Sequence, residues 1–397
     1  PSAVAEIKKA IENSELKIKE IDEKVKKILS AKKWLKLNTL KKVNKENLVA
    51  DLNTYNASYL NHELYKNAIT VIKNNNIIPI TRLDTLNIAT VNIGKSTSKG
   101  FKNSINKYCR SNEFFITKKA TDEQLSSLNK SLGNSNLIVL YVYQMNQNSY
   151  QNFGLSKEVD QLCQSIDNKS KIILNVFGSP YALSKFKSIS KVDGVLIAYE
   201  DEKTPNELTG QLLFGGIRAR GKLPVSINEN FKEGFGLSTS KNRLSYVFPE
   251  SIGIDSKSLL KIDSIIEESF KEKVFPGCQI YAAKDGQVFF HKSYGKHTYE
   301  QTSKAVENSD IYDLASITKI ASSAAALMDL HQKNKISLDS SLRDYLPQLV
   351  DSTEYSKIIL KEMLTHQAKL TPWIPFYIKT LYKGKPKYEI YSIKKSS

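Results

Sequence analysis

Short apolar runs alternate with helix-forming segments between residues 46 and 229, and this alternation constrains the fold more than any other feature. Runs such as Leu137-Ile-Val-Leu-Tyr and Ile172-Ile-Leu-Asn-Val contain almost no polar residue, which is typical of strands buried on both faces. Such strands form a largely parallel sheet, because the helices between them cross over and cover both faces. The pattern predicts an α/β three-layer sandwich over residues 46–229.

The same periodicity predicts the order of the elements. The expected helices cover residues 47–74, 121–132, 156–166 and 205–214, with a short helix after Pro180. The expected strands cover residues 87–93, 137–143, 171–176 and 194–199.

Residues 1–38 read as two helices, and the second has one apolar stripe formed by Ile18, Ile21, Val25, Ile28 and Leu29. Two helices cannot bury such a stripe alone, so a partner domain is expected.

Three stretches resemble glycoside hydrolase family 3: residues 21–34, residues 66–74, and the run Leu212-Leu-Phe-Gly-Gly-Ile-Arg-Ala-Arg-Gly-Lys-Leu-Pro-Val225. The resemblance implies that residues 1–45 are the helical end of a catalytic barrel missing upstream, and that residues 46–229 are the family's C-terminal sandwich. It also implies a β-N-acetylglucosaminidase-like enzyme whose nucleophilic aspartate and histidine-based acid/base group belong to the barrel, and are therefore not in this chain. A carbohydrate substrate and no cofactor are expected.

Two features of the sandwich region leave alternatives open. Gly215, Gly216 and Gly221 lack the spacing of a dinucleotide fingerprint, so turn glycines are favoured over a phosphate cradle. The carboxylates at 200–202 follow a strand, where open α/β sheets bind ligands, but a solvated loop explains them equally well. One acidic cluster does not define a glycosidase pair.

Residues 230–246 are polar and read as a linker, and a second domain is expected over residues 247–397. Its first elements are an amphipathic helix at 255–270 and a hairpin whose turn is Asp285-Gly286.

Ser316 and Lys319 are the candidate catalytic residues. They stand where the apolar, alanine-rich stretch 317–330 predicts that a buried helix begins. The i, i+3 spacing places the lysine amine on the same face as the serine, so the pair can act as nucleophile and proton acceptor. Ser-x-x-Lys also occurs elsewhere, for example at Ser14 and Ser258. The alternative is that Ser316 only caps a core helix.

The stretch 310–333 resembles the serine β-lactamase and penicillin-binding-protein family, closest to its class C, esterase-like branch. Leu364-Thr-His-Gln-Ala-Lys369-Leu resembles that branch's Leu-Thr-His-Thr-Ser-Gly-Leu, with Lys369 in the place of glycine. The family's Tyr-x-Asn-type and Lys-Thr-Gly-type elements have no match, and Lys379-Thr380-Leu381 lies in a segment without a strand pattern. The resemblance therefore implies the start of an α+β β-lactamase-like domain that is incomplete.

Composition limits the partners. Lys+Arg exceed Asp+Glu by 58 to 41, giving a net charge of +17. The lysines are spread out and no aromatic-basic motif accompanies them, so a solvated surface is expected rather than nucleic-acid binding. Cys109, Cys163 and Cys278 have neither metal-ligand nor disulfide spacing. No apolar run reaches transmembrane length and no signal peptide is visible.

These observations predict part of a bifunctional hydrolase, in which a β-N-acetylglucosaminidase-like glycosidase is joined to a serine hydrolase acting on cell-wall glycan or peptide. The resemblance implies a periplasmic or secreted bacterial protein. The alternative is a catalytically inactive scaffold that binds carbohydrate or cell wall. A basic nucleic-acid-binding module is the third hypothesis, supported by net charge alone.

Overall fold

A computed structural model describes residues 2–39, 45–94, 100–371 and 373–386. The chain divides into two compact units, residues 1–308 and residues 309–397, which are considered separately below. The predicted boundaries at 45, 229 and 246 subdivide the first unit and stay a prediction.

The centre of the first unit is a sheet whose six described strands lie in the order β1-β6-β5-β4-β2-β3. Five of them run parallel, and β1 pairs antiparallel with β6. The strands are β1 (Thr70–Asn74), β2 (Ile88–Ile93), β3 (Asn112–Ile116), β4 (Leu137–Val142), β5 (Lys171–Val176) and β6 (Gly194–Ile197).

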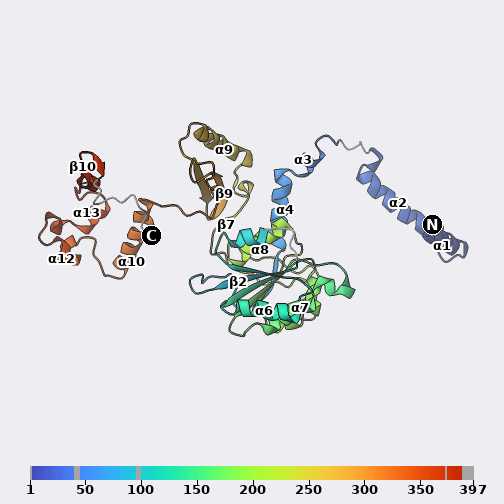
Figure 1. Cartoon of the computed structure of the whole chain (residues 1–397). Helices are drawn as coiled ribbons and strands as arrows, with labels where there is room; N and C mark the ends of the chain where they lie inside the picture. The colour runs from blue at the N-terminus through green and yellow to red at the C-terminus, as the bar shows by residue number, and fades with distance from the viewer. Residues whose placement is uncertain (1, 40–44, 95–99, 372, 387–397) are drawn as a thin grey trace. The chain divides into compact units, whose positions relative to one another are not determined.

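Helices cover both faces of this sheet (Figure 1). On one face α6 (Asp122–Leu132) and α7 (Lys157–Ser165) pack against Ile138, Leu140 and Val142. On the other, α5 (Gly100–Ile105) and α8 (Lys203–Leu213) pack against Leu137, Val139 and Tyr141. Successive β4 side chains thus enter opposite cores, as strand geometry requires. The predicted three-layer α/β sandwich with a largely parallel sheet is confirmed.

The other elements around the sheet are short, apart from α4. They are α3 (Leu48–Leu52), α4 (Tyr55–Ala68), η2 (Ser149–Gly154), η3 (Pro180–Lys185) and η4 (Lys187–Ser190).

The sequence was misread in two places. The helix predicted over residues 47–74 ends at Ala68, and Thr70–Asn74 forms strand β1, whose Val71 and Ile72 are buried in opposite cores. Only Ile69 separates the two elements, so their apolar residues formed one continuous pattern. Strand β3 and helix α5 were not predicted, and β3 is an edge strand with few buried residues, so it carries little of the apolar signal.

The N-terminal helices α1 (Ser2–Glu12) and α2 (Ile18–Trp34) form as predicted, followed by η1 (Leu37–Thr39). Neither α1 nor α2 contains a buried residue. The stripe residues Ile18, Val25, Ile28 and Leu29 are 45–63% exposed, so the part of the chain described here leaves this apolar face without a cover.

Residues 230–244 are irregular but attached to the sandwich, and strand β7 begins at Ser245. Phe231 and Phe235 pack against one of its cores, and the Leu237 amide donates to the Val71 carbonyl at 2.8 Å. The Arg243 guanidinium donates to the carbonyl oxygens of Thr81 at 2.9 Å and Phe214 at 2.8 Å. This segment is polar in composition, yet it is packed against the sandwich.

A small sheet follows in the order β7-β9-β8, accompanied by helix α9 (Ser256–Lys271), whose N-cap is Asp255. Its strands are β7 (Ser245–Tyr246), β8 (Gly277–Lys284) and β9 (Gln287–Gly295), and η5 (Pro249–Ile252) precedes the helix. The helix and the hairpin across Asp285-Gly286 form where the sequence predicted them.

The second unit consists of short elements. They are η6 (Lys319–Ala324, a π-helix), α10 (Ala325–Gln332), α11 (Leu342–Tyr345), α12 (Pro347–Val350), η7 (Glu354–Lys357), α13 (Leu360–Leu364), η8 (Phe376–Thr380), β10 (Leu381–Tyr382) and β11 (Lys385–Pro386). Contrary to prediction, residues 381–382 do form a strand, a two-residue one that pairs with β11.

Candidate functional site

Ser316 and Lys319 meet in the second unit. The Lys319 Nζ donates a hydrogen bond to the Ser316 Oγ at 2.9 Å. Helical residues begin at Ile317, directly after the serine, so the predicted start of the helix is correct. Over residues 319–324 the helix has π-type hydrogen bonding, a local widening that often accompanies functional sites.

The backbone before the helix turns sharply to present the serine. Ala315 has a φ of +44°, and its amide donates to the Asp313 carboxylate at 2.8 Å. The amides of Ile317 and Thr318 donate to the carbonyl oxygens of Leu314 and Ala315 at 3.0 and 3.1 Å. Among the described contacts of the Ser316 Oγ, no backbone amide donates to it. The geometry therefore gives no support to a capping role for this side chain.

The predicted burial of this helix is wrong. Ile317, Ile320 and Met328 are 60%, 75% and 72% exposed, and Ser316 and Lys319 are exposed as well. Within residues 309–386 the strands are the two-residue pair β10 and β11, which is too small to cover an apolar helix face. Helical periodicity identified the apolar face, but it could not show whether another element covers that face.

The second family-like segment keeps the backbone shape that its glycine would favour. Helix α13 ends at Leu364, and Lys369 has a φ of +53°, in the left-handed region. Lysine at this position therefore changes the side chain and adds strain, while the turn itself remains.

A second group of candidate residues lines a cavity of about 630 Å³ at the carboxyl edge of the large sheet. It lies beyond the ends of β4, β5 and β6, and its lining includes Glu200, Asp201 and Glu202. This is the edge where open α/β sheets bind ligands. The structure thus places the acidic cluster in a hollow, although Glu200 and Glu202 are well exposed.

Two residues that bond to the lining of this cavity were not identified from the sequence. The Tyr65 hydroxyl donates to the Glu200 carboxylate, and burial together with this bond raises the pKa of Tyr65. The Lys118 Nζ donates to the carbonyl oxygens of Gln144 and Gly154, both at 2.7 Å. Burial lowers the pKa of Lys118 to about 8, while the charge of Asp201 opposes that shift. No local sequence signal links Tyr65 to Glu200, because 135 positions separate them.

The sequence predicted no metal site, no disulfide framework and no transmembrane segment. No group of three or more potential metal ligands occurs among the described residues, and the three cysteines are free. No helix in the described ranges is long and apolar enough to cross a membrane.

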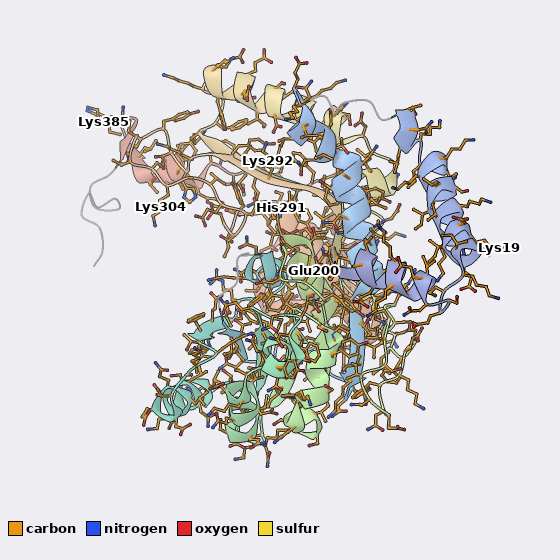
Figure 2. The ribbon with its side chains drawn as sticks, turned by 90° about the vertical axis from the view of Figure 1, so that its right-hand side faces the viewer. Lys19, Glu200, His291, Lys292, Lys304 and Lys385 are labelled. Atoms are coloured by element: carbon orange, nitrogen blue, oxygen red, sulfur yellow. The ribbon has the colours of Figure 1, made fainter. Side chains whose placement is uncertain are left out.

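Many basic residues of the first unit lie apart from one another on its surface. Lys19, Lys292 and Lys304 belong to α2, β9 and the loop after β9, and all three are exposed (Figure 2). The side chains of the unit form several ion pairs with acids, including Lys292 with Asp263 at 2.6 Å. This distribution is that of a solvated surface.

One family model matches the C-terminal part of the chain. The family model described as Beta-lactamase matches residues 262–385. The matched stretch includes α9 from residue 262 onward, the β8–β9 hairpin and the Ser316–Lys319 pair.

Two curated relatives match over short stretches. Protein flp of Staphylococcus aureus (strain NCTC 8325 / PS 47) is 32% identical over 96 residues, which are 24% of this chain and 18% of that protein. An N-acetylmuramyl-L-alanine amidase of Bacillus subtilis (strain 168) is 27% identical over 139 residues, which are 32% of this chain and 31% of that protein. The chain thus spans less than a third of either relative.

Two of the solved structures with partial likeness are glycosidases by name. A glycoside hydrolase family 3 β-N-acetylglucosaminidase from Paenibacillus sp. str. FPU-7 has a TM-score of 0.40 and 18% identity, covering 55% of this chain and 41% of that one. A β-glucosidase from Listeria innocua has a TM-score of 0.42 and 17% identity, covering 56% and 34%. These scores alone do not define the fold.

Proposed function

We propose that this chain is part of a bifunctional hydrolase acting on cell-wall material outside the cytoplasm. In this proposal residues 46–229 are the sandwich of a β-N-acetylglucosaminidase-like glycosidase, and residues 247–397 belong to a serine β-lactamase-like hydrolase. The three sequence stretches that resemble family 3 support the first half. The family match over residues 262–385 and the cell-wall amidase among the relatives support the second.

The observation that carries the serine hydrolase is the hydrogen bond of 2.9 Å between Lys319 and Ser316. A charged lysine can only donate hydrogen bonds, so in this arrangement it stabilises negative charge on the serine oxygen. A neutral Lys319 amine in the same place would accept the serine proton as Oγ attacks an acyl carbon. The product is an ester on Ser316, and the proton on Lys319 is then available to the leaving group. Water attacking that ester releases the acid and restores the serine.

The test uses the protein expressed from its complete reading frame and a fluorophosphonate or acylating probe. Ser316→Ala should abolish labelling, and Lys319→Met should slow it by several orders of magnitude, because neither proton transfer nor charge stabilisation remains. Ser323→Ala and Lys335→Met are matched controls, since both positions are exposed and lie on or just after the same helix. Both controls should label at the unaltered rate.

The alternative is a catalytically inactive scaffold that binds carbohydrate or cell wall. The strained lysine at 369 and the exposed setting of Ser316 favour it. Under this alternative the unaltered protein resists every probe, while Ser316→Ala costs at most about 1 kcal/mol of stability. If the unaltered protein and Ser316→Ala are then retained equally on purified cell wall, the result supports the binding scaffold.

A further inference from the structure

The first unit contains a basic cavity that the proposed hydrolase chemistry does not use. Its volume is about 210 Å³, and four cationic side chains line it: Lys66, Arg218, Arg220 and Lys241. One carboxylate, Glu63, is part of the same lining. The cavity therefore carries a net charge of about +3 from these five residues at neutral pH.

The two arginines are presented by the glycine-rich stretch that ends the sandwich. Ile217 and Ala219 are buried at 4% and 0%, whereas Arg218 and Arg220 are exposed. The Ala219 amide donates to the Thr239 Oγ1 at 2.9 Å, which fixes the backbone between the two arginines. No ion pair or hydrogen bond of either guanidinium is found among the described residues. Both groups thus retain their donors.

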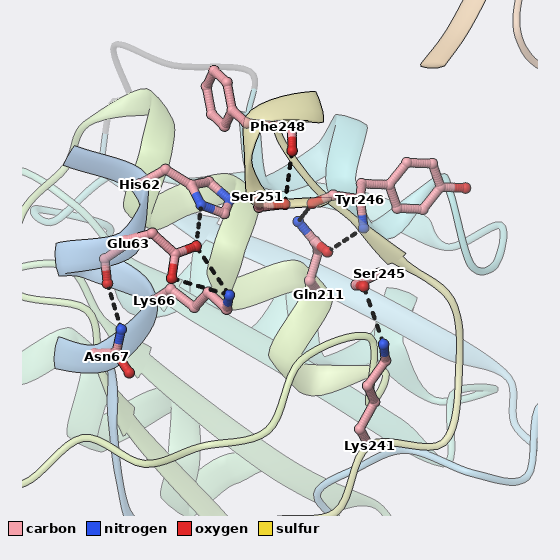
Figure 3. A network of polar contacts seen from close by, with 10 residues as sticks. All are labelled: His62, Glu63, Lys66, Asn67, Gln211, Lys241, Ser245, Tyr246, Phe248 and Ser251. Carbon is pink, nitrogen blue, oxygen red and sulfur yellow. Dashed lines mark hydrogen bonds and ion pairs between the residues drawn. The ribbon is translucent and has the colours of Figure 1, made fainter. Parts of the chain in front are cut away.

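The two lysines differ in their contacts (Figure 3). Lys66 turns back onto Glu63, with Nζ–Oε distances of 3.0 and 3.2 Å. Lys241 reaches the Ser245 Oγ at 3.2 Å and has no carboxylate partner among the described contacts. Lys66, Arg218 and Lys241 line the same cavity, and burial together with the charges of the other two lowers the pKa of Lys241.

Cations that converge without matching acids repel each other, so their arrangement is stabilised by an anion between them. We propose that this cavity binds a phosphate oxyanion, carried by a phosphorylated sugar or present as free phosphate. Arginine suits this ligand, because its planar fork donates two parallel hydrogen bonds to a phosphate. Of the three glycines in this stretch, Gly216 is part of the cavity wall, whereas Gly215 and Gly221 are not. The arginine side chains of the same stretch line the cavity as well.

The size and the charge of the cavity favour phosphate over a carboxylate. A volume of about 210 Å³ exceeds what one phosphate group needs, since a water molecule's share of the liquid is about 30 Å³. A phosphate monoester carries close to two negative charges at neutral pH and offsets most of the net +3, whereas a carboxylate carries one. Asn67 and Gln287 add amide groups to the wall, which can hydrogen-bond hydroxyls of an attached sugar.

The test is calorimetric titration of the whole chain with inorganic phosphate, N-acetylglucosamine 6-phosphate and N-acetylglucosamine. We expect both phosphates to bind and the neutral sugar not to bind. The double variant R218Q/R220Q should bind about 100-fold more weakly, about tenfold for each lost charge-assisted contact. The matched control is R110Q/K119Q, which removes the same charge from two exposed positions outside the cavity. It should bind as the unaltered chain does.

Each outcome decides the proposal. An equal loss in R218Q/R220Q and R110Q/K119Q would show attraction by net charge and overturn it, as would failure of both phosphates to bind at millimolar concentration. Tighter binding of the sugar phosphate than of inorganic phosphate would identify a phosphorylated glycan as the source. Equal binding would identify the free anion. Circular dichroism of the three proteins checks that the exposed substitutions leave the fold intact.

Discussion

The sandwich and the serine-bearing unit differ in how their apolar residues are used. In the sandwich, both faces of the sheet are covered and β4 is buried at every position. In the second unit the helix after Ser316 has no buried residue, and among the described residues after 308 the buried apolar side chains are Val350 and Leu360. The sandwich therefore supplies its own hydrophobic stabilisation, whereas the Ser316–Lys319 pair depends on local geometry. The contact between Ser316 and Lys319 can thus be set by four consecutive residues while the surrounding unit contributes little packing.

Removing the same side chain from each region tests this difference in packing directly. Leu140→Ala in β4 should lower the free energy of unfolding by 2–5 kcal/mol, about the cost of a cavity in a packed core, because Leu140 is fully buried. Leu349→Ala should change it by about 0.5 kcal/mol or less, because Leu349 is 73% exposed. Hydrogen exchange of the amides of each unit, monitored during urea unfolding, measures the two changes in the free energy of unfolding. Equal costs would show that the second unit is packed as tightly as the sandwich.

Limited proteolysis tests where the regions separate. Residues 311–314 have no regular structure, and Ile311 and Leu314 are 89% and 53% exposed. Residues 231–243 are tied to the sandwich through Phe231, Phe235 and Arg243. Chymotrypsin should therefore cut first near residues 311–314. First cleavage within 230–246 would instead support the linker predicted from composition.

A smaller effect is expected in the second family-like segment. Lys369 has a φ of +53°, and the left-handed conformation costs a non-glycine residue about 1–2 kcal/mol. Lys369→Gly should recover about 1 kcal/mol, part of the gain being lost to the larger entropy of the unfolded chain. Thermal unfolding measures the change. Lys361→Gly is the control, because residue 361 lies in helix α13, where glycine should destabilise by about 1 kcal/mol.

The features that could be predicted from the sequence are those set by residues close together in the chain. Strands buried on both faces were visible in runs such as Leu137–Val142, and the Ser316–Lys319 contact follows from helical spacing. The split between α4 and β1 was missed because a single residue separates them. The Tyr65–Glu200 contact and the basic cavity join positions far apart in the chain, and chain folding alone brings them together. The predicted burial of the Ser316 helix was wrong for the same reason. An apolar stripe shows which face of a helix could be buried, but it does not show which element covers that face.

The last prediction concerns pH and again sets a buried group against an exposed one. Lys118 is half-buried, and its pKa in the folded protein is lowered from the ordinary value of 10.5 to about 8. Between these two values the unfolded chain binds more protons at Lys118 than the folded protein does, so this residue makes stability rise with pH. Below about pH 8 the cost of burying the charge is fully present, and above about pH 10.5 it is gone. Lys118→Met should therefore remove this rise, whereas the exposed Lys119→Met should retain it. Urea unfolding at several pH values across the window measures both slopes. A slope unchanged by Lys118→Met would show that Lys118 titrates as it does in the unfolded chain, and that the edge of the sheet beside Asp201 is open to water.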